Sequence, residues 1–281
     1  MRVLVTGSSG KVGRFTVREL HRLGHEVTHV DRDRPAEELP GMWIQADLTD
    51  AGEVYDVFHR AKPQGVCHIG ANPDPGHFPS PQIYRNNVMS TFNTMLAAGD
   101  VGAKRFIYAG SEMATGWLTT DEHPKRFPFN EEDRVDSPNP YALSKYNGEI
   151  IADSMVARYP DMPIVTLRIN NVILPDGYDV LEYRRKNYPE PGSANYWSYI
   201  DVRDVARAFA SALAGESKGH EVFLIAAADT CIDVPIRQAF EERFGFDGPF
   251  ADDHGEHASV FDCSKIRKWF GWEPKYSWRD R

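Results

Sequence analysis

Cysteine is scarce, and its spacing matches no metal-binding pattern. The chain of 281 residues holds three cysteines, Cys67, Cys231 and Cys263. An odd number at these distances favours free thiols over a disulfide framework or a zinc site. We therefore expect a cytoplasmic protein without a metal ion, with Cys67 buried in a strand.

The sequence also lacks a long apolar run and an excess of positive charge. No stretch approaches the roughly 20 apolar residues that cross a bilayer, and the first expected strand begins at Arg2, which leaves no room for a secretion signal. The formal net charge is −9, with Lys and Arg scattered along the chain. We expect neither a membrane nor a nucleic acid among its partners.

Short apolar runs alternate with stretches of helical periodicity over the first 170 residues. Strands are expected at Arg2–Thr6, Glu26–Asp31, Met42–Ala46, Gly65–Ile69, Arg105–Ala109 and Ile164–Ile169, and helices at Phe15–Leu23, 51–62, 82–100 and 140–159. Because parallel strands need crossover helices, this order predicts an α/β fold with a doubly wound parallel sheet, the Rossmann arrangement.

After residue 170 the alternation becomes looser. Turn-forming residues fill Pro175–Pro191, a helix is expected at Val202–Leu213 and a strand at Glu221–Ile225. We expect a dinucleotide-binding Rossmann domain at 1–170. Residues 171–281 should form a mixed region that contributes a small C-terminal substrate lobe and returns to the sheet.

The segment Thr6–Gly13 (TGSSGKVG) lies between the first expected strand and the first helix. Its glycines would let backbone amides approach a pyrophosphate, and the helix N-terminus favours negative charge there. A loop that merely needs positive φ angles is the alternative, but the flanking elements favour a dinucleotide site. The residues expected to contact the cofactor are Gly7, Ser9, Gly10, Lys11, Val12 and Gly13.

Asp31 ends the second expected strand, 18 residues after Gly13. A carboxylate there would accept hydrogen bonds from the adenosine ribose and repel a 2′-phosphate, which favours NAD over NADP. A solvated strand-end residue is the alternative. Arg14, Arg32 and Arg34 lie close in sequence, and one of them could balance the negative charge of a 2′-phosphate, which keeps NADP open.

Asp47 and Leu48 follow the third expected strand, where they could line the adenine pocket. A helix cap before Ala51 explains Asp47 equally well.

Tyr141 and Lys145 stand four residues apart in a helix, so their side chains share one helix face. An ammonium near a phenol favours the phenolate, which can take a proton from a substrate hydroxyl. Ser111 follows the fifth expected strand, at the sheet edge where doubly wound folds bind ligands. Ser111, Tyr141 and Lys145 are therefore the expected catalytic residues.

These segments together resemble the extended short-chain dehydrogenases, the NAD-dependent epimerase/dehydratase family. The resemblance spans nearly the whole chain and rests on TGSSGKVG (6–13), HIGAN (68–72), NNVMST (86–91), YAGSEMATG (108–116), YALSK (141–145), LRINNV (167–172), YIDVRDVARA (199–208) and FGWEP (270–274). It implies the roles above for Ser111, Tyr141 and Lys145. It further implies that Gly70, Ala71, Asn87 and Ile169 contact or support NAD, with Tyr141 and Lys145, and that Asn171 approaches the substrate.

Two helices of this family, here 82–100 and 140–159, pair between subunits in many relatives, so the resemblance implies a homodimer. Sugar-nucleotide epimerases are similar but carry a longer segment for the nucleotide, whereas only about 28 residues separate Val172 from Asp201 here. The dehydratase branch carries two acidic residues directly after the hydroxyl residue. Here Ser111 is followed by Glu112 and Met113, so one acidic residue of the pair is missing and the resemblance to dehydratases is weaker.

The compact length resembles the uronate dehydrogenases, in which an arginine of the short insert binds the substrate carboxylate. Arg184 and Arg185 are the candidates, with a solvated basic loop as the alternative. Glu112 would repel a uronate, which favours a neutral aldose or another polyol. The loop 72–79, including His77, should form one wall. Expected substrate contacts are Asn72, Ser111, Glu112, Met113, Asn171 and Arg184.

The expected function is hydride transfer between NAD and a carbinol of a sugar or sugar acid. A nucleotide-sugar epimerase needs the same catalytic residues and stays the first alternative. A non-catalytic NAD-binding sensor is the second, although sensing would not require Ser111, Tyr141 and Lys145.

Overall fold

Seven parallel strands form one sheet in the order β3-β2-β1-β4-β5-β6-β9. The structure is a computed structural model that describes residues 1–73, 78–190, 192–245 and 250–280. The strands are β1 (Arg2–Thr6), β2 (Glu26–Asp31), β3 (Met42–Gln45), β4 (Gly65–His68), β5 (Arg105–Ser111), β6 (Ile164–Ile169) and β9 (His220–Ile225). The order reverses between β1 and β4, so the predicted doubly wound sheet is confirmed.

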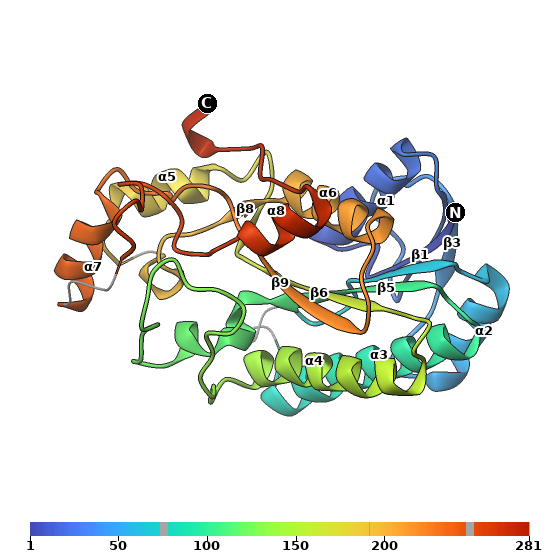
Figure 1. Cartoon of the computed structure of the whole chain (residues 1–281). Helices are drawn as coiled ribbons and strands as arrows, with labels where there is room; N and C mark the ends of the chain where they lie inside the picture. The colour runs from blue at the N-terminus through green and yellow to red at the C-terminus, as the bar shows by residue number, and fades with distance from the viewer. Residues whose placement is uncertain (74–77, 191, 246–249, 281) are drawn as a thin grey trace.

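Helices cover both faces of the sheet (Figure 1). One face carries α1 (Lys11–Arg22), α6 (Val202–Ala214) and α8 (Ser264–Phe270), and the other carries α2 (Ala51–Ala61), α3 (Ser80–Asp100) and α4 (Pro140–Arg158). Side chains alternate between the two cores along each strand, so Val3 and Val5 pack under α1 and α6 while Leu4 packs under α2. This burial of both faces explains why the strands read as continuous apolar runs.

Two predicted boundaries were wrong, and one helix was not predicted. α1 begins at Lys11, four residues earlier than predicted, because Gly10 serves as the extended N-cap. β5 continues to Ser111, so this residue ends the strand instead of following it. The turn-rich stretch after Pro175 contains a helix, α5 (Asp179–Lys186), whose acidic first turn and basic last turn suit the helix dipole.

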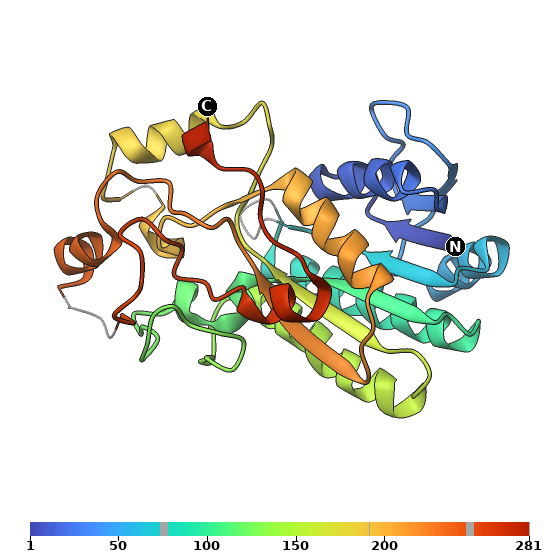
Figure 2. The same cartoon turned by 45° about the horizontal axis from the view of Figure 1, so that its top comes forward.

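Aromatic side chains form the core of a lobe that includes α5 and α7 (Ile236–Phe244). Figures 1 and 2 show these two helices at one end of the sheet. The short pair β7 (Val172–Ile173) and β8 (Ile200–Asp201) connects the lobe to the main sheet. The buried rings of the lobe are Trp117, Phe127, Phe129, Tyr178, Tyr196, Trp197, Tyr199, Phe240, Phe250 and Phe261. Three of these rings precede residue 170, so the lobe combines segments from both halves of the chain.

The structure also bears on Cys67 and on membrane-spanning helices. Cys67 lies in β4 and is fully buried, as predicted. No helix in the described part of the chain is long and apolar enough to cross a membrane.

A buried ion pair joins α4 to β6. Both carboxylate oxygens of Glu149 accept hydrogen bonds from the Arg168 guanidinium at 2.9 Å, and the two side chains are only 6% and 4% exposed. Removing one partner would leave the other charge buried without compensation.

We expect Arg168→Met to lower the free energy of unfolding by about 3 kcal/mol, or Tm by about 8 °C in thermal melts followed by circular dichroism. Arg60→Met is the matched control, since the Arg60–Asp56 pair is 51% and 65% exposed and should shift Tm by less than about 1 °C. Equal shifts in the two variants would contradict this account of the buried pair.

Candidate active site

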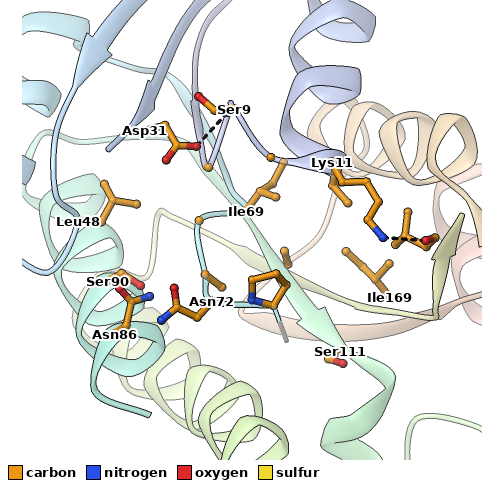
Figure 3. A pocket seen from close by; sticks show the side chains of 18 of the residues that line it. Ser9, Lys11, Asp31, Leu48, Ile69, Asn72, Asn86, Ser90, Ser111 and Ile169 are labelled. Atoms are coloured by element: carbon orange, nitrogen blue, oxygen red, sulfur yellow. Dashed lines mark hydrogen bonds between the residues drawn. The ribbon is translucent and has the colours of Figure 1, made fainter. Parts of the chain in front are cut away.

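A cavity of about 750 Å³ opens at the carboxyl ends of the strands (Figure 3). It brings together most of the residues that the sequence proposed for cofactor and substrate: Gly7, Ser9, Gly10, Lys11, Val12, Asp31, Asp47, Leu48, Gly70, Ala71, Asn72, Ser111, Glu112, Met113, Tyr141, Lys145, Ile169 and Asn171. Gly13, Asn87 and Arg184 lie outside the cavity wall as the described residues form it. Of the proposed loop wall, Asn72, Pro73 and Phe78 line the cavity, and His77 lies outside the described residues.

The glycine loop touches the loop after β4 backbone to backbone. Gly7 has φ +67°, and a Cβ there would lie 2.5 Å from the amide nitrogen of Gly70. A Cβ on Gly13 would overlap the carbonyl of Gly7, so Gly13 allows the turn to close onto α1 without reaching the cavity. The cavity therefore faces main-chain amides at the N-terminus of α1, a surface suited to a pyrophosphate.

Asp31 lies at the end of β2 and faces the glycine loop. Its two carboxylate oxygens accept hydrogen bonds from the main-chain nitrogens of Ser9 (2.9 Å) and Arg32 (2.8 Å). These bonds hold the carboxylate at the cavity edge, where its remaining lone pairs can accept ribose hydroxyls. Arg14 forms a 3.8 Å ion pair with Glu37.

Asp47 caps a turn, but not the helix. Its Oδ1 accepts bonds from the amide and hydroxyl of Thr49, both at 2.8 Å, and the N-cap of α2 is Asp50. The helix-cap alternative for Asp47 is therefore wrong. Leu48 packs against Gly70, where a Cβ would come within 2.7 Å of the leucine side chain.

The proposed catalytic side chains converge at the ends of β5 and α4. Asn139 caps α4 by accepting from the amides of Tyr141 and Ala142, which fixes the first turn that carries the phenol. The Lys145 ammonium donates to the Ala109 carbonyl at 2.8 Å and lies 5.8 Å from the centre of the Tyr141 ring. Ser111, on the neighbouring strand end, is 6% exposed.

Burial strongly affects the charged groups behind this site. Desolvation lowers the pKa of Lys145 to about 7. Desolvation, with the nearby Lys145, lowers the pKa of His68 to about 3, so the imidazole is neutral. A neutral ring adds no competing positive charge near the ammonium.

Asn87 supports the wall from behind. Its Oδ1 accepts from the amide of Asn72 at 2.8 Å, and its Nδ2 donates to the Asn72 carbonyl and to the Ser144 hydroxyl. Asn87 thus connects the loop after β4 to the helix that carries Tyr141 and Lys145.

Glu112 occupies the cavity wall directly after Ser111 and is 6% exposed. Burial raises its pKa well above the ordinary range, against the opposing effects of Arg184, the Asn171 amide and the Asn195 side chain. The carboxyl group is therefore a desolvated polar group on the cavity wall, next to Ser111 in the chain.

Sequence reasoning missed several residues that line the cavity. Asn86 and Ser90 stand one turn apart on α3 and face the cavity near Leu48 in Figure 3. Asn170 follows β6 and was not missed: it lines the cavity between the expected residues Ile169 and Asn171. The i, i+4 spacing of Asn86 and Ser90 was a usable indication, whereas nothing local indicated which face of α3 turns toward the strand ends.

Lys11 bridges the loop and the lobe. Its ammonium donates to the Val172 carbonyl of β7 at 3.1 Å (Figure 3), and burial lowers its pKa.

For metals, the described ranges contain no group of three His, Cys, Asp or Glu side chains that could hold an ion.

Residues 3–226 match the family described as NAD dependent epimerase/dehydratase. The chain is 25% identical to UDP-glucose 4-epimerase from Lactobacillus helveticus over 314 positions, covering 98% of this chain and 93% of that protein. It is 30% identical to NAD-dependent glucose-6-phosphate dehydrogenase from Haloferax volcanii over 213 positions, covering 71% and 76%. The structure resembles that of the UDP-glucose 4-epimerase of Thermus thermophilus in complex with NAD, with TM-score 0.74, 23% identity and 99% and 96% coverage, a likeness of fold.

The buried ammonium of Lys145 predicts a pH-dependent stability. Below pH 7 the folded and unfolded states both hold the proton, so the full desolvation penalty of the charge is present. Between pH 7 and the ordinary pKa of 10.5 only the unfolded chain holds it, so the penalty disappears as pH rises.

We expect Lys145→Met to raise Tm of the cofactor-free protein by roughly 5 °C at pH 6.5 and by much less at pH 10, measured by differential scanning fluorimetry. Lys104→Met removes an exposed lysine and serves as the control. An equal gain for Lys145→Met at both pH values would show that packing, and not charge, is responsible.

Proposed function

The chain belongs to the NAD-dependent epimerase/dehydratase family, and from this premise we propose that it is a dehydrogenase that oxidises a carbinol of a free sugar or sugar acid. The observation that carries the proposal is the convergence of Ser111, Tyr141 and Lys145 on the same cavity as the glycine loop. A proton acceptor and a dinucleotide site that share one cavity suit hydride transfer.

We assign the cofactor site to residues that fit each part of NAD. The amides of the glycine loop suit the pyrophosphate, Asp31 suits the adenosine ribose, and Leu48 suits the adenine. Bound at these positions, NAD would supply the hydride acceptor. The ends of β5 and β6 would then border the nicotinamide, with Ile169 on the wall.

The chain's own residues handle the proton. The Tyr141 phenolate takes the proton of the substrate hydroxyl as the hydride leaves the same carbon, which becomes a carbonyl. Ser111 donates a hydrogen bond that orients the reacting oxygen. The Lys145 ammonium, close to the phenol, favours the phenolate form, and the proton passes to solvent at the open side of the cavity.

The filled interior of the lobe favours a small substrate. Aromatic side chains fill its interior, with Tyr196, Trp197 and Phe240 all 2% exposed or less. The cavity of about 750 Å³ must accept a dinucleotide as well as the substrate, which favours a free sugar over a nucleotide sugar. The H. volcanii relative is named for a dehydrogenase of a sugar phosphate, a substrate without a nucleotide.

A nucleotide-sugar epimerase is the second candidate. It is favoured by the similarity to the L. helveticus UDP-glucose 4-epimerase, which extends over 98% of this chain. An epimerase would use the same three side chains to oxidise and then reduce one substrate. A non-catalytic sensor has no comparable support, because it would not require them.

The proposal also covers the domains, the cellular location and the oligomeric state. We propose that residues 1–170 form the cofactor domain and that residues 171–281 form most of the substrate lobe. We also propose a cytoplasmic location, in keeping with three free thiols, and a homodimer. The exposed outer surfaces of α3 and α4 carry apolar side chains that suit a subunit interface: Tyr84, Met89, Phe92, Leu143 and Ile150.

The function is tested by NADH absorbance after the protein and NAD are mixed with free aldoses, uronates, sugar phosphates and nucleotide sugars. We expect NADH to accumulate with a free sugar or sugar acid. Tyr141→Phe should reduce turnover at least about a thousandfold while leaving NAD binding unchanged, because only the proton acceptor is lost. A nucleotide sugar that changes on chromatography without net NADH would establish the epimerase instead.

The dimer is tested by light scattering after size exclusion. Ile150→Glu places a charge on the exposed face of α4, where the native side chain is 46% exposed, and should convert a dimer into monomers. Leu23→Glu, at a 48% exposed position beside α1, should leave the mass unchanged. A monomeric wild-type protein would rule out the dimer.

A further inference from the structure

The segment that follows α8, residues 274–280, is bonded to elements that lie far from it in the chain. Apart from a 3-10 turn at Trp278–Asp280 it has irregular backbone, so its position depends on contacts with its neighbours. Figure 2 shows it running from α8 past α6 toward α5. We call residues 274–280 the strap.

A buried carboxylate of α6 anchors the start of the strap. The main-chain amides of Lys275 and Tyr276 both donate to Oδ2 of Asp204, at 2.9 and 3.0 Å, and Asp204 is fully buried. The guanidinium carbon of Arg203 lies 3.5 Å from the centre of the Tyr276 ring. Because a backbone without a ladder needs such partners for its amides, Asp204 fixes the point at which the strap leaves α6.

Asp229 gathers the next contacts, in the lobe. Its Oδ1 accepts a hydrogen bond from the Tyr199 hydroxyl at 2.8 Å, and its Oδ2 accepts one from the Ser277 hydroxyl at 2.7 Å. The Arg279 guanidinium forms an ion pair with the same Oδ2 at 3.3 Å. The Tyr199 hydroxyl oxygen also accepts the main-chain amide of Trp278 at 2.9 Å. The strap is therefore bonded to Tyr199 both directly and through Asp229.

The far end of the strap reaches α5. Asp233 forms ion pairs with Arg185 of α5 at 3.0 Å and with Arg279 at 3.7 Å. Both guanidiniums also lie over the Trp278 ring, 5.3 and 4.6 Å from its centre, and the indole N–H donates to the Thr230 carbonyl at 2.9 Å. Partly exposed ion pairs are weak one by one, so the shared carboxylate and ring make this end a network.

Tyr199 passes this support to the wall of the cavity. It directly precedes β8, where the Ile200 amide donates to the Asn171 carbonyl at 2.9 Å. Ile200 also pairs with Val172, the first residue of β7. Asn171 and Val172 both line the cavity. Because paired strands move together, a displacement of Tyr199 would shift this part of the wall.

Resting on the proposed function, we propose that the strap is a positioning element: it holds Asn171 and Val172 in place through Tyr199, and it thereby sets the affinity of the enzyme for the sugar and not for NAD. Its own residues lie outside the cavity wall that the described residues form, so the strap acts through the wall and not by touching a ligand.

Most of the NAD site should not depend on the strap. The glycine loop, Asp31 and Leu48 follow β1, β2 and β3, whereas Asn171 and Val172 follow β6, beyond the reversal of strand order. Lys11 of the loop reaches the Val172 carbonyl, but this hydrogen bond is exposed and 3.1 Å long, so it contributes little. A shift of the wall therefore changes the substrate end of the cavity.

The first test is Arg279→Met, which removes the ion pairs to Asp229 and Asp233 at a partly exposed position. We expect KM for the sugar to rise about tenfold, with kcat and the dissociation constant of NAD changed by less than about twofold, because only ground-state binding of the sugar is lost. Arg267→Met is the matched control, since the Arg267–Glu273 pair is 61% and 58% exposed, and it should change none of the three values. A lower kcat at unchanged KM would overturn the proposal.

A double variant tests whether the strap acts as one unit. Tyr199→Phe keeps the ring but removes the hydroxyl that joins Asp229 to the Trp278 amide, and it should also raise KM about tenfold. Combined with Arg279→Met, it should raise KM by no more than about twofold beyond the more affected single variant. Effects that multiply to about a hundredfold would show two separate local defects and would contradict the proposal.

Hydrogen exchange of the cofactor-free protein keeps this inference distinct from the proposed function. We expect Arg279→Met to speed exchange about tenfold in peptides that contain Val172 and Ile200, with no change in β1 and β2. That result would support the strap even if no sugar reduced NAD, in which case only the dehydrogenase would be lost. Faster exchange confined to residues 274–280 would overturn the inference whatever the activity.

Discussion

Gly7 and Gly70 stand backbone against backbone where the strand order reverses, and the cofactor end of the cavity depends on this contact. Thr6 secures it, because its hydroxyl oxygen accepts from the amides of Ile69 (3.0 Å) and Gly70 (3.1 Å). With no side chain at either glycine, the two loops leave a crevice walled by main-chain amides. A dinucleotide needs such a crevice, and a doubly wound sheet forms one only at its switch point.

The same threonine extends the constraint toward α4, the helix that carries Tyr141 and Lys145. Since Thr6 Oγ1 already accepts two amides, its O–H donates to Nδ1 of His68 at 2.8 Å, which leaves the Nε2 hydrogen for Thr91 at 3.2 Å. The Tyr108 ring stacks on that of His68, with centroids 6.0 Å apart, and its hydroxyl donates to the Lys145 carbonyl. Buried contacts therefore run from the cofactor loop through β4 and β5 to α4, with a hydrogen bond from His68 to Thr91 of α3. They hold the two halves of the site in register.

Desolvation governs the other end of the cavity. It keeps the His68 imidazole neutral and lowers the pKa of Lys145 to about 7. β9 joins the aromatic lobe to the sheet, since Phe223 and Ile225 pack into the sheet core and Leu224 packs into the lobe. Glu112 lies on the cavity wall directly after β5, where burial raises its pKa.

The sequence by itself determined the fold class, the glycine turn between β1 and α1, and the spacing of Tyr141 and Lys145, because each depends on residues close together in the chain. Only the tertiary structure decided that Asn87 supports the wall from behind, that Asp47 caps a turn, that α5 is helical, and that Arg184 lies outside the cavity wall as the described residues form it. These features depend on which helix face meets the sheet and which loops touch. Such contacts between distant segments carry no local periodicity, so the sequence could indicate which residue types gather at the site but not how they are arranged.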